Sequence, residues 1–365
     1  MRGVIIAGGF GTRLRPLTLR RPKPLIPVAN RAFLEYQVAQ LRSAGAEEIV
    51  FATNYLADRI QAHFGDGSRY GVRMRYAVEN EPLGTAGAIR NAVEGLPPMR
   101  AIVFNGDILT DFDIGGIVRL HHERGAQVTL TLYRVRRPHP YGVIQVDDTG
   151  RVQAFVEPTE EQKRAADRGE PIEGDDFINA GIYIMESETL SRIPLRPCSI
   201  EREFYPQILV EGVPVYGAEG IGFWLDIGRP AQYLRATRAL LNGEVRTALR
   251  PGGHCTEAGY WLDGHAEIQP DAEIETGCLI GLNATIESGV KISGYTVVGA
   301  YSTIGSGSIL HGCVLGERVQ IGDGCHLQDC ILDDEVVVEP HAQLCNAVLG
   351  AGSVIRAYST FQPNG

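Results

Sequence analysis

The 365-residue chain is poor in lysine and has no long run of hydrophobic residues. Only three of its 34 basic residues are lysines (Lys23, Lys163 and Lys291), so 31 are arginines. Where arginine dominates in this way, a retained lysine points to a position that needs a compact point charge. The N-terminal apolar run breaks at glycine after a few residues and is too short for a signal peptide or a membrane span. We expect a cytoplasmic protein without a membrane partner.

Cysteine usage and net charge exclude further classes of protein. The seven cysteines form no CxxC pair and have no histidine at zinc spacing, which favours reduced thiols over disulfides or a structural metal. The formal net charge is -10, whereas a general nucleic-acid binder would carry a basic excess. The length and the 44% apolar content predict about two globular domains. No nucleic-acid partner is therefore expected.

A glycine-rich stretch near the start carries the strongest chemical signal. The apolar residues 4–7 predict a buried parallel strand, which leads into Gly8, Gly9 and Gly11. Glycines at this spacing let backbone N–H groups converge on an anion. Further donors and positive charge follow at Thr12, Arg13, Arg15 and Lys23. The stretch predicts a polyphosphate-binding loop, although a solvated surface turn has the same spacing.

The loop differs from the two commonest phosphate-binding motifs. It lacks the Lys-Ser/Thr ending of a P-loop, and Leu14 stands where a dinucleotide fingerprint needs its third glycine. Residues 8–18, Gly-Gly-Phe-Gly-Thr-Arg-Leu-Arg-Pro-Leu-Thr, with Pro-Lys-Pro at 22–24, instead resemble the signature loop of the sugar-phosphate nucleotidylyltransferases. Members of this family join a sugar 1-phosphate to a nucleotide and release pyrophosphate. The resemblance implies that Arg13 holds the leaving phosphates and that Lys23 bridges the incoming phosphate and the α-phosphate.

Helical and strand patterns alternate after this loop. Apolar residues on one helical face predict a helix that starts near residue 33 and ends at Gly45, then a strand over 49–52, a helix over 58–64 and a strand over 72–78. The alternation predicts a Rossmann-like α/β domain with a mostly parallel sheet. Ligands of such sheets bind beyond the carboxyl ends of the strands, so the motifs are expected to share one edge.

A second glycine-bearing loop opens a predicted helix. Residues 79–88, Glu-Asn-Glu-Pro-Leu-Gly-Thr-Ala-Gly-Ala, resemble the base-recognition segment of the family, which implies nucleotide contacts by Glu79, Gly84 and Thr85. A carboxylate accepts from both N1–H and the exocyclic amine of guanine, whereas uracil and thymine offer one N–H beside acceptor oxygens. GTP is therefore the favoured nucleotide. Glu81 is an alternative residue for contacting the base. The purely structural interpretation of this segment is a helix that is capped near Thr85.

Two aspartates are candidates for a magnesium site. Asp107 follows an apolar strand over 101–104, a position that fits either a metal ligand or a helix cap. Gly106-Asp107 resembles the metal-binding aspartate of the family, and Phe223-Trp224-Leu225-Asp226-Ile227-Gly228 resembles the segment with the second one. The resemblance implies that Asp107 and Asp226 hold Mg²⁺. Asp111 and Asp113 are expected to begin the next helix.

The sugar side is expected in a strand-rich stretch from residue 127. Strands over 141–146 and 152–156, joined by a turn at 147–150, predict a hairpin laid against the core sheet. Segments 141–143 and 179–183 resemble sugar-side segments of the family, although by themselves they read as ordinary turns. The residues implied to bind sugar are Tyr141, Gly142, Glu157 and Asn179.

The chain departs from the family pattern at one point. The usual Phe-x-Glu-Lys-Pro, whose glutamate holds sugar hydroxyls and whose lysine holds the sugar phosphate, is here Phe155-Val156-Glu157-Pro158. The missing lysine leaves open the identity of the acceptor and whether activity is full. Four other residues are candidates to supply the positive charge of the missing lysine: Arg136, Arg137, Lys163 and Arg164. Lys163 fits a solvated helical pair equally well.

A different pattern begins near residue 256. An aliphatic residue recurs every six positions from Ile268 to Ile304 and, after short steps, from Leu310 to Leu349, with a small or β-branched residue two positions before each. This hexapeptide repeat predicts a left-handed parallel β-helix of about five triangular coils. Four cysteines take the small inward position. Similar β-helices serve as acyltransferases, so four histidines are candidate catalytic residues (His265, His311, His326 and His341), but a scaffold for homo-oligomerisation or regulation is favoured.

These patterns predict four segments and one reaction. Residues 1–235 form a nucleotidyltransferase domain, 236–255 a helical linker, 256–358 the β-helix and 359–365 a tail. The short β-helix and Glu79 resemble mannose-1-phosphate guanylyltransferases, so GTP and mannose 1-phosphate are the expected substrates. The alternatives are an unusual sugar or cyclitol phosphate as acceptor, or a weakly catalytic subunit that senses nucleotide sugars.

Overall fold

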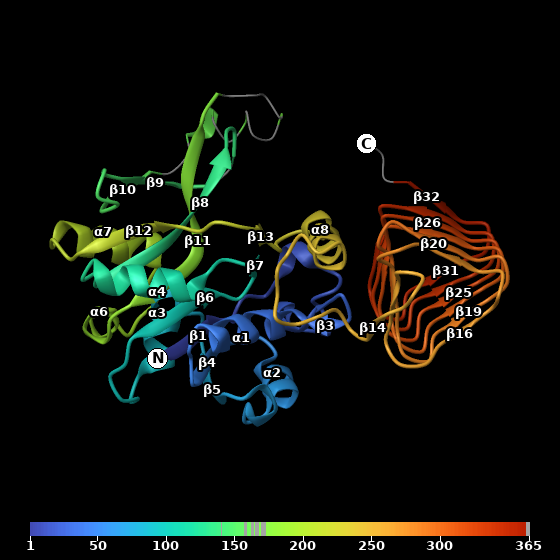
Figure 1. Cartoon of the computed structure of the whole chain (residues 1–365), viewed down its shortest axis with the longest axis horizontal. Coiled ribbons are helices and arrows are strands. Elements are labelled where there is room, and N and C mark those ends of the chain that lie inside the picture. The colour runs from blue at the N-terminus through green and yellow to red at the C-terminus, as the bar shows by residue number, and fades with distance from the viewer. Residues whose placement is uncertain (140, 157–158, 162–163, 165–167, 169–172, 363–365) are drawn as a thin grey trace. The chain divides into compact units, whose positions relative to one another are not determined.

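The computed structural model describes residues 1–139, 141–156, 159–161, 164, 168 and 173–362. Its chain divides into two compact units, which are described separately (Figure 1). Unit 1 comprises Met1–Gly9 and Gln37–Trp224, and unit 2 comprises Phe10–Tyr36 and Leu225–Gly365. None of the helices in the described ranges has the length and apolar character of a membrane-spanning segment.

Unit 1 is built on a nine-stranded sheet with the order β10-β9-β11-β6-β1-β4-β5, in which β8 pairs with β11 and β12. Four neighbouring strands at one end of this sheet are parallel, as predicted: β1 (Arg2–Ile6), β4 (Glu48–Thr53), β5 (Arg73–Val78) and β6 (Ala101–Asn105). All six residues of β4 are buried, which is typical of a parallel strand covered on both faces. The Rossmann-like character of the domain therefore resides in these strands.

The remaining strands of the sheet extend it on the β6 side. They are β8 (Val128–Arg136), β9 (Val143–Val146), β10 (Val152–Val156), β11 (Asp175–Met185) and β12 (Val215–Glu219). Strand β11 is antiparallel to β6, to β8 and to β9, whereas β12 is parallel to β8. The β9–β10 hairpin is present as predicted, but it continues the sheet edge through a pairing of Val143 with Ile178. Figure 1 shows β8 and β11 running on as a long two-stranded arm.

Helices and one short strand complete unit 1. The elements are α1 (Phe33–Ser43, shared with unit 2), α2 (Ala57–Phe64), η3 (Ser68–Tyr70), α3 (Gly84–Val93), β7 (Ile108–Thr110), α4 (Ile114–Glu123), α6 (Ser187–Arg192), η4 (Ile200–Phe204) and α7 (Tyr205–Val210). Of these, α1, α2, α3 and α4 lie where the sequence predicts helices. Asp113 caps α4 by accepting a hydrogen bond from the Gly116 N–H at 2.8 Å, which confirms its predicted structural role.

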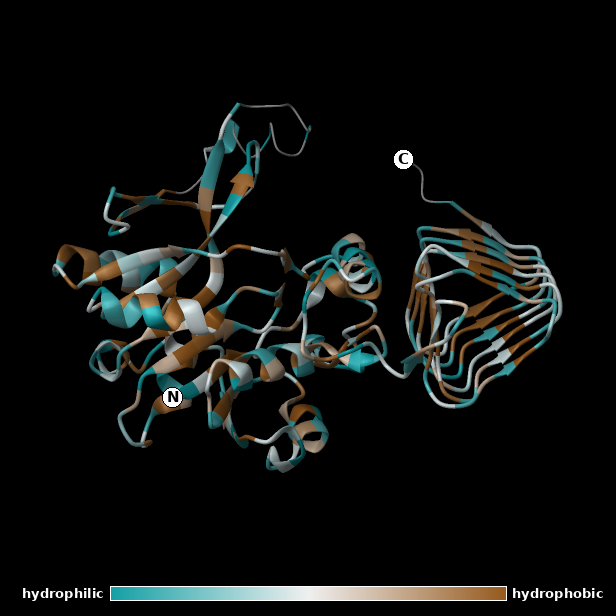
Figure 2. Ribbon diagram, viewed as in Figure 1, coloured by the Kyte–Doolittle hydropathy of each residue, from teal (hydrophilic) through white to brown (hydrophobic). Residues whose placement is uncertain are grey.

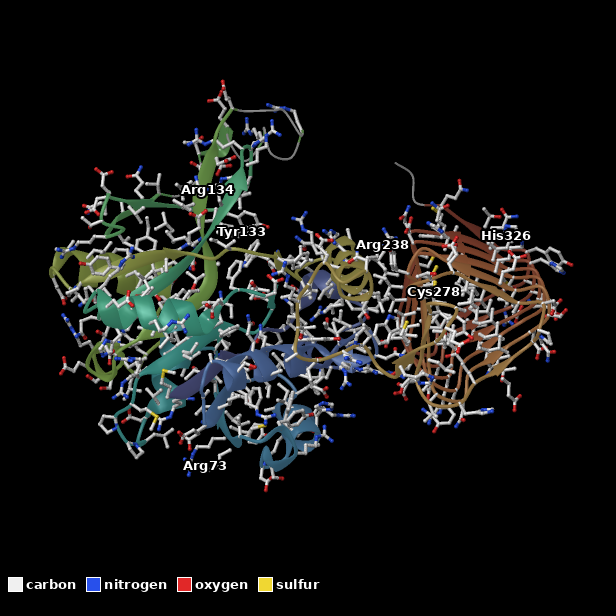
Figure 3. The ribbon with its side chains drawn as sticks, viewed as in Figure 1. Arg73, Tyr133, Arg134, Arg238, Cys278 and His326 are labelled. Carbon is white, nitrogen blue, oxygen red and sulfur yellow. The ribbon has the colours of Figure 1, made fainter. Side chains whose placement is uncertain are left out.

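Unit 2 begins with the signature loop and ends with a parallel β-helix. Its non-repetitive elements are η1 (Thr12–Leu14), η2 (Lys23–Leu25), β2 (Pro27–Val28), β3 (Arg31–Ala32), β13 (Trp224–Asp226, which starts in unit 1) and α8 (Pro230–Leu241). Within unit 2, Arg21 forms an ion pair with Asp334, and Arg238 of α8 pairs with Asp329 (Figure 3 labels Arg238). These pairs attach the loop and α8 to the coils of the β-helix.

The hexapeptide repeat folds into three parallel ladders, as the period predicts. The first runs β14 (His254–Cys255), β15 (Trp261–Leu262), β18 (Leu279–Ile280), β21 (Val297–Val298), β24 (Val314–Leu315), β27 (Ile331–Leu332) and β30 (Val348–Leu349), with β14 antiparallel. The second runs β16 (Glu267–Ile268), β19 (Thr285–Ile286), β22 (Thr303–Ile304), β25 (Gln320–Ile321), β28 (Val337–Val338) and β31 (Val354–Ile355). The third runs β17 (Glu273–Ile274), β20 (Lys291–Ser293), β23 (Ile309–His311), β26 (His326–Gln328), β29 (Gln343–Cys345) and β32 (Thr360–Phe361).

The interior of the β-helix is filled by the residues of the repeat. Cys278, Cys313, Cys325 and Cys330 are buried free thiols at the small inward positions, as predicted (Figure 3 labels Cys278). Figure 2 shows the corresponding hydrophobic stripes in successive coils. The third ladder continues to β32, beyond residue 358 where the repeat was expected to stop.

Candidate active site

The carboxyl ends of the parallel strands of unit 1 collect several predicted site residues at one edge. The Gly106 N–H donates to the carbonyl of Ile6 at 2.9 Å, and a Cβ on Gly106 would lie 2.4 Å from that oxygen. Glycine is therefore required where β6 turns past the end of β1. Asp107 follows immediately, next to the strand that leads into Gly8 and Gly9. The predicted shared edge is confirmed for these residues.

A residue that the sequence analysis missed holds the turn at Asp107 in place. The buried side-chain amide of Gln37, on α1, donates to the carbonyl of Asn105 at 2.9 Å and to that of Ile108 at 2.8 Å. These two carbonyls flank Gly106 and Asp107. The sequence offers one signal for this role, a polar residue at a helix position that is buried. The partners of Gln37 lie about 70 positions away, so only the folded structure identifies them.

The predicted base-reading segment starts at the same edge. The Asn54 side chain, after β4, donates to the backbone carbonyl of Glu79 at 2.9 Å. The Glu79 side chain is 8% exposed, and its carboxylate accepts from the Leu83 N–H at 3.0 Å. Burial raises the pKa of Glu79, and the Leu83 N–H opposes that rise. The carboxylate is thus oriented by its own loop, while Glu81 is exposed.

Gly84 and Thr85 contact a segment distant in sequence. Gly84 has φ +67°, and a Cβ there would lie 2.7 Å from the carbonyl of Cys198. The Thr85 hydroxyl accepts from the Ile200 N–H at 2.8 Å. Both residues therefore tie the base-reading loop to the start of η4. The sequence motif was expected to serve the nucleotide directly, and these contacts add a structural role.

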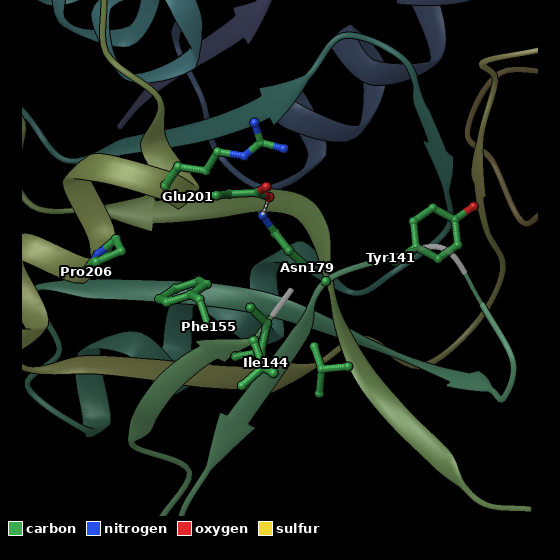
Figure 4. A pocket seen from close by; sticks show the side chains of 10 residues that line it. Tyr141, Ile144, Phe155, Asn179, Glu201 and Pro206 are labelled. Atoms are coloured by element: carbon green, nitrogen blue, oxygen red, sulfur yellow. Dashed lines mark hydrogen bonds between the residues drawn. The ribbon is translucent and has the colours of Figure 1, made fainter. Parts of the chain in front are cut away.

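The sugar-side residues line a cavity of about 530 Å³ in unit 1 (Figure 4). One part of its lining is apolar and comes from Val143, Ile144, Phe155, Val156 and Pro206. The polar part comes from Tyr141, Asn179, Glu201 and Arg202, with Gly142 beside them. A surface that is apolar on one side and hydrogen-bonding on the other suits a sugar ring, which presents C–H faces and hydroxyl edges.

Three of the four residues predicted to bind sugar, Tyr141, Gly142 and Asn179, line this cavity. Glu157 lies outside the described residues, as does Lys163. The other three candidate substitutes for the missing lysine, Arg136, Arg137 and Arg164, are not among the described residues that line the cavity. Arg137 pairs with Asp176, and within the described lining the one cationic side chain is that of Arg202. Glu201 and Arg202 were missed, because nothing local to their sequence connects them with segments 141–143 and 179–183.

An aromatic cluster supports the cavity from the side of β8. The Trp224 ring stacks on Tyr133 at 5.3 Å and meets Tyr141 edge-on at 5.8 Å, and its Nε1 donates to the carbonyl of Ala180 at 2.9 Å (Figure 3 labels Tyr133). Beside it, the Thr110 hydroxyl donates to the Phe223 carbonyl at 2.7 Å. Phe223 is therefore held next to β7, the strand that follows Asp107.

Other predicted site residues lie in unit 2. Gly11 adopts φ +60°, and the Thr18 hydroxyl donates to its carbonyl at 2.9 Å. A Cβ on Gly11 would lie 3.1 Å from Cβ of Lys23, so the loop folds back and brings Lys23 beside its glycine turn. The resulting short 3-10 turn places Thr12 and Arg13 directly after Gly11.

Arg13 also lies against the segment that carries Asp226. A Cβ on Gly228 would lie 3.0 Å from a guanidinium nitrogen of Arg13, so that side chain packs closely against the backbone at Gly228. Gly228 is two residues after Asp226, and its N–H donates to the Gln232 side chain at 3.2 Å. Arg13 of the glycine loop and the segment 225–228, more than 200 positions apart, are thereby neighbours within unit 2.

The donor chemistry of Asp107 and Asp226 fits a magnesium ion held jointly with substrate. Mg²⁺ is usually bound by one or two carboxylates plus water and phosphate oxygens rather than by an all-protein cage. Consistent with this, the described ranges contain no group of three or more His, Cys, Asp or Glu side chains arranged to hold a metal. A metal at either aspartate would depend on the phosphates of the substrate.

Comparison with known proteins defines the class. The family model for nucleotidyl transferase matches residues 2–243, and that for the GMPPB C-terminal domain matches residues 258–353. The chain belongs to the nucleotidyl transferase family. Its fold, a Rossmann-like domain with a β-helix, agrees with both matches and with the expectation from the glycine loop.

Individual relatives narrow the class further. The chain is 37% identical over 297 residues to the mannose-1-phosphate guanylyltransferase of Mycobacterium tuberculosis. The aligned region covers 80% of this chain and 79% of that protein. It is 35% identical to the probable mannose-1-phosphate guanylyltransferase 2 of Arabidopsis thaliana, over 82% of this chain and 81% of that protein. Among solved structures, HddC from Yersinia pseudotuberculosis matches with a TM-score of 0.53 in its complex with GMP-PN, at 26% identity, over 65% of this chain and 97% of that one.

Proposed function

We propose that this protein transfers the GMP moiety of GTP to mannose 1-phosphate, forming GDP-mannose and pyrophosphate with Mg²⁺. The observation that carries the proposal is the match over about four fifths of the chain to proteins named mannose-1-phosphate guanylyltransferase. The placement of a buried carboxylate, Glu79, at the expected base position supports guanine. The cavity of about 530 Å³ with an apolar and a polar side supports a sugar acceptor.

The reaction is an in-line displacement at the α-phosphorus of GTP. A phosphate oxygen of the sugar 1-phosphate attacks, the bond to the bridging oxygen breaks, and pyrophosphate leaves with its electron pair. Because the attacking oxygen is already anionic at neutral pH, no general base is required. Catalysis then depends on positioning and on neutralising charge in the transition state.

The residues of the two units take complementary roles in this proposal. Gly8, Gly9, Gly11 and Thr12 supply loop amides for the triphosphate, and Arg13 holds the β- and γ-phosphates as they leave. Lys23 bridges the incoming phosphate and the α-phosphate as a point charge. Asp107 and Asp226 are the residues that would hold Mg²⁺, and the ion would screen the negative charge of the phosphates.

The proposal also covers the domain boundaries and the association of copies of the chain. Residues 1–235 act as the catalytic domain, and the β-helix serves as the surface on which copies associate. Light scattering of the purified protein tests the assembly, and a monomer at micromolar concentration would contradict it.

A pyrophosphate-release screen that crosses five nucleoside triphosphates with a panel of sugar and cyclitol 1-phosphates tests the function. GTP with mannose 1-phosphate is expected to give the highest kcat/KM. A different acceptor is favoured by one specific observation, the proline at position 158 in place of the family lysine. Higher turnover with another acceptor would establish that alternative, and turnover with no pair would favour a nucleotide-sugar sensor.

A further inference from the structure

The cavity in unit 1 contains a carboxylate that the family resemblance did not assign. Glu201 lies on η4, a short π-helical segment, and its side chain is exposed in the cavity wall. Figure 4 shows it facing Asn179, whose side-chain amide donates to the Glu201 carboxylate. A carboxylate offers about four lone-pair sites, so this hydrogen bond leaves acceptor capacity for a ligand.

Asn179 is occupied by protein partners on both ends of its amide. Its Nδ2 donates to the Tyr183 hydroxyl at 2.8 Å as well as to Glu201, and its Oδ1 accepts from the Gly181 N–H at 3.0 Å. The amide therefore has little capacity left for a sugar hydroxyl. Its position explains instead why the Glu201 carboxylate takes one orientation.

The surroundings of Glu201 are rigid. Below it, Phe155 stacks on Tyr205 at 5.5 Å, and Tyr183 meets Tyr205 edge-on at 5.6 Å. The segment before it is held by the hydrogen bond from the Ile200 N–H to Thr85 and by that from the Ser199 N–H to Glu203 at 2.8 Å. Burial first, and the negative charge of Glu201 second, raise the pKa of Tyr183. The Glu201 carboxylate thus lies on the polar side of the cavity, and Phe155, which packs on Tyr205, forms part of the apolar side.

The neighbouring residue extends the argument to the orientation of a ligand. Arg202 is the one cation among the described residues of the lining, and an arginine binds phosphate oxygens with paired N–H groups. Glu201 can therefore accept hydrogen bonds from the hydroxyl groups of a sugar phosphate, and Arg202 can bind its phosphate group.

We propose that Glu201, oriented by Asn179, accepts hydrogen bonds from hydroxyl groups of the sugar 1-phosphate and so determines which sugar is used. Asn179 is then a positioning residue rather than a sugar ligand. The proposal rests on the proposed function for its substrate class, and it names the residue that reads the sugar.

The kinetic test compares Glu201→Gln with the wild type. The substitution keeps the shape and removes the charge, so KM for mannose 1-phosphate is expected to rise roughly 10- to 100-fold, the usual loss for a hydrogen bond to a charged group. KM for GTP is expected to stay within about twofold, because only the sugar side is altered. Glu211→Gln is the matched control, since Glu211 forms an ion pair with Arg192 on the surface after α7. An unchanged KM for mannose 1-phosphate in Glu201→Gln overturns the proposal.

A double-mutant cycle tests the positioning role of Asn179. Asn179→Ala is expected to raise KM for the sugar phosphate in the wild-type background and to add less than about twofold in the Glu201→Gln background, because both changes disable the same interaction. Fully additive effects would show that Asn179 binds sugar by itself and would overturn its positioning role. Glu201→Asp replaces Glu201→Gln if the latter does not fold.

Ligand-observed NMR separates this proposal from the proposed function. Saturation-transfer spectra with mannose 1-phosphate and with glucose 1-phosphate are recorded for wild type and Glu201→Gln in the presence of GTP and without metal. Sugar signals that are present in the wild type and weakened in the variant support the role of Glu201, even if no turnover is detected and the proposed function fails. Equal signals in both proteins, or none in the wild type, overturn it.

Discussion

The Thr85 hydroxyl accepts a hydrogen bond from the Ile200 N–H at 2.8 Å, across 115 positions of sequence. Thr85 belongs to the loop that carries Glu79, whereas Ile200 begins the segment that places Glu201 and Arg202 in the cavity. The close approach of Gly84 to the Cys198 carbonyl reinforces the same contact. The loop predicted to read the base and the cavity predicted to bind sugar are therefore joined by this contact within unit 1.

Thr85→Val is expected to loosen η4 and to leave the Ile200 N–H without its acceptor. The free energy of unfolding should fall by about 1–2 kcal/mol, and KM for the sugar phosphate should rise more than KM for GTP. Thr85→Ser keeps the hydroxyl and should behave like the wild type. Denaturant unfolding and steady-state kinetics measure both effects. A rise confined to KM for GTP would instead indicate that Thr85 contacts the nucleotide directly.

Lys23→Ala is expected to lower kcat by about a hundredfold or more, since one preorganised electrostatic contact to a transition state contributes this much. Lys23→Arg should restore little, because a planar guanidinium does not replace a compact ammonium. The control is Lys291→Ala, which removes an exposed pair with Glu273 in the β-helix. Pyrophosphate release at saturating substrates provides the measurement. Wild-type turnover by Lys23→Ala would refute the assignment.

Removal of divalent metal with EDTA is expected to abolish turnover, and added Mg²⁺ should restore it. Asp107→Asn and Asp226→Asn should raise the Mg²⁺ concentration for half-maximal activity and lower kcat, because each substitution removes a charged ligand. Asp113→Asn is the matched control, as asparagine also caps a helix and Asp113 already caps α4. An unchanged Mg²⁺ dependence in both aspartate variants would exclude them as ligands.

The raised pKa of Glu79 predicts a pH effect on nucleotide binding. Burial is the main cause of the shift, so the carboxyl takes up its proton at a pH above its usual 4.5. As pH falls through this raised value, the carboxyl can no longer accept from both guanine donors, and KM for GTP should increase. Glu79→Gln should have a high KM for GTP that does not change over the same pH range.

The same shift has a consequence for folding. Because the pKa is raised in the folded state, ionisation of Glu79 costs stability as pH rises through that value, so Glu79→Gln should not be destabilised at neutral pH.

Glu81→Gln tests which of the two glutamates contacts the base. If it reproduces the loss of GTP affinity and Glu79→Gln does not, Glu81 is the base reader.

Glu48 provides a prediction about stability. It accepts from Nε of Arg2 at 2.9 Å and from Nε of Arg75 at 2.7 Å, and Arg2 is 2% exposed. Glu48→Gln leaves the Arg2 charge buried without a carboxylate and should lower the free energy of unfolding by about 3 kcal/mol. Glu273→Gln, which breaks an exposed pair, should cost less than about 1 kcal/mol.

The pH dependence of this effect has a defined sign. Burial raises the pKa of Glu48, but the hydrogen bonds from Arg75 and Arg2 outweigh it, so the pKa lies below 4.5. The stabilisation is present above the unfolded pKa and is lost as pH falls through the folded one. The difference between wild type and Glu48→Gln should therefore shrink in strong acid, and a constant difference in urea unfolding from pH 7 to pH 3 would contradict this origin.

The sequence by itself determined the features whose signal is local. The six-residue period defines the β-helix because each coil repeats the same inward positions, and the alternating pattern of strands and helices predicts the four parallel strands β1, β4, β5 and β6. The glycine loop and the aspartate segments were recognisable because close backbone approach and phosphate chemistry restrict the residues that fit. At Gly106 and Gly84 a Cβ would clash with a backbone carbonyl, so the structure gives the steric reason for these two glycines.

Only the tertiary structure decided the partners of polar side chains. Gln37 at the turn of Asp107, Ile200 at Thr85 and Asn179 at Glu201 are pairs whose members lie 22 to 115 positions apart. Burial and hydrogen bonding between such residues depend on which strands and helices become neighbours, and no local pattern encodes that. The hairpin expected against the sheet extends its edge instead, because backbone pairing with β11 is available there.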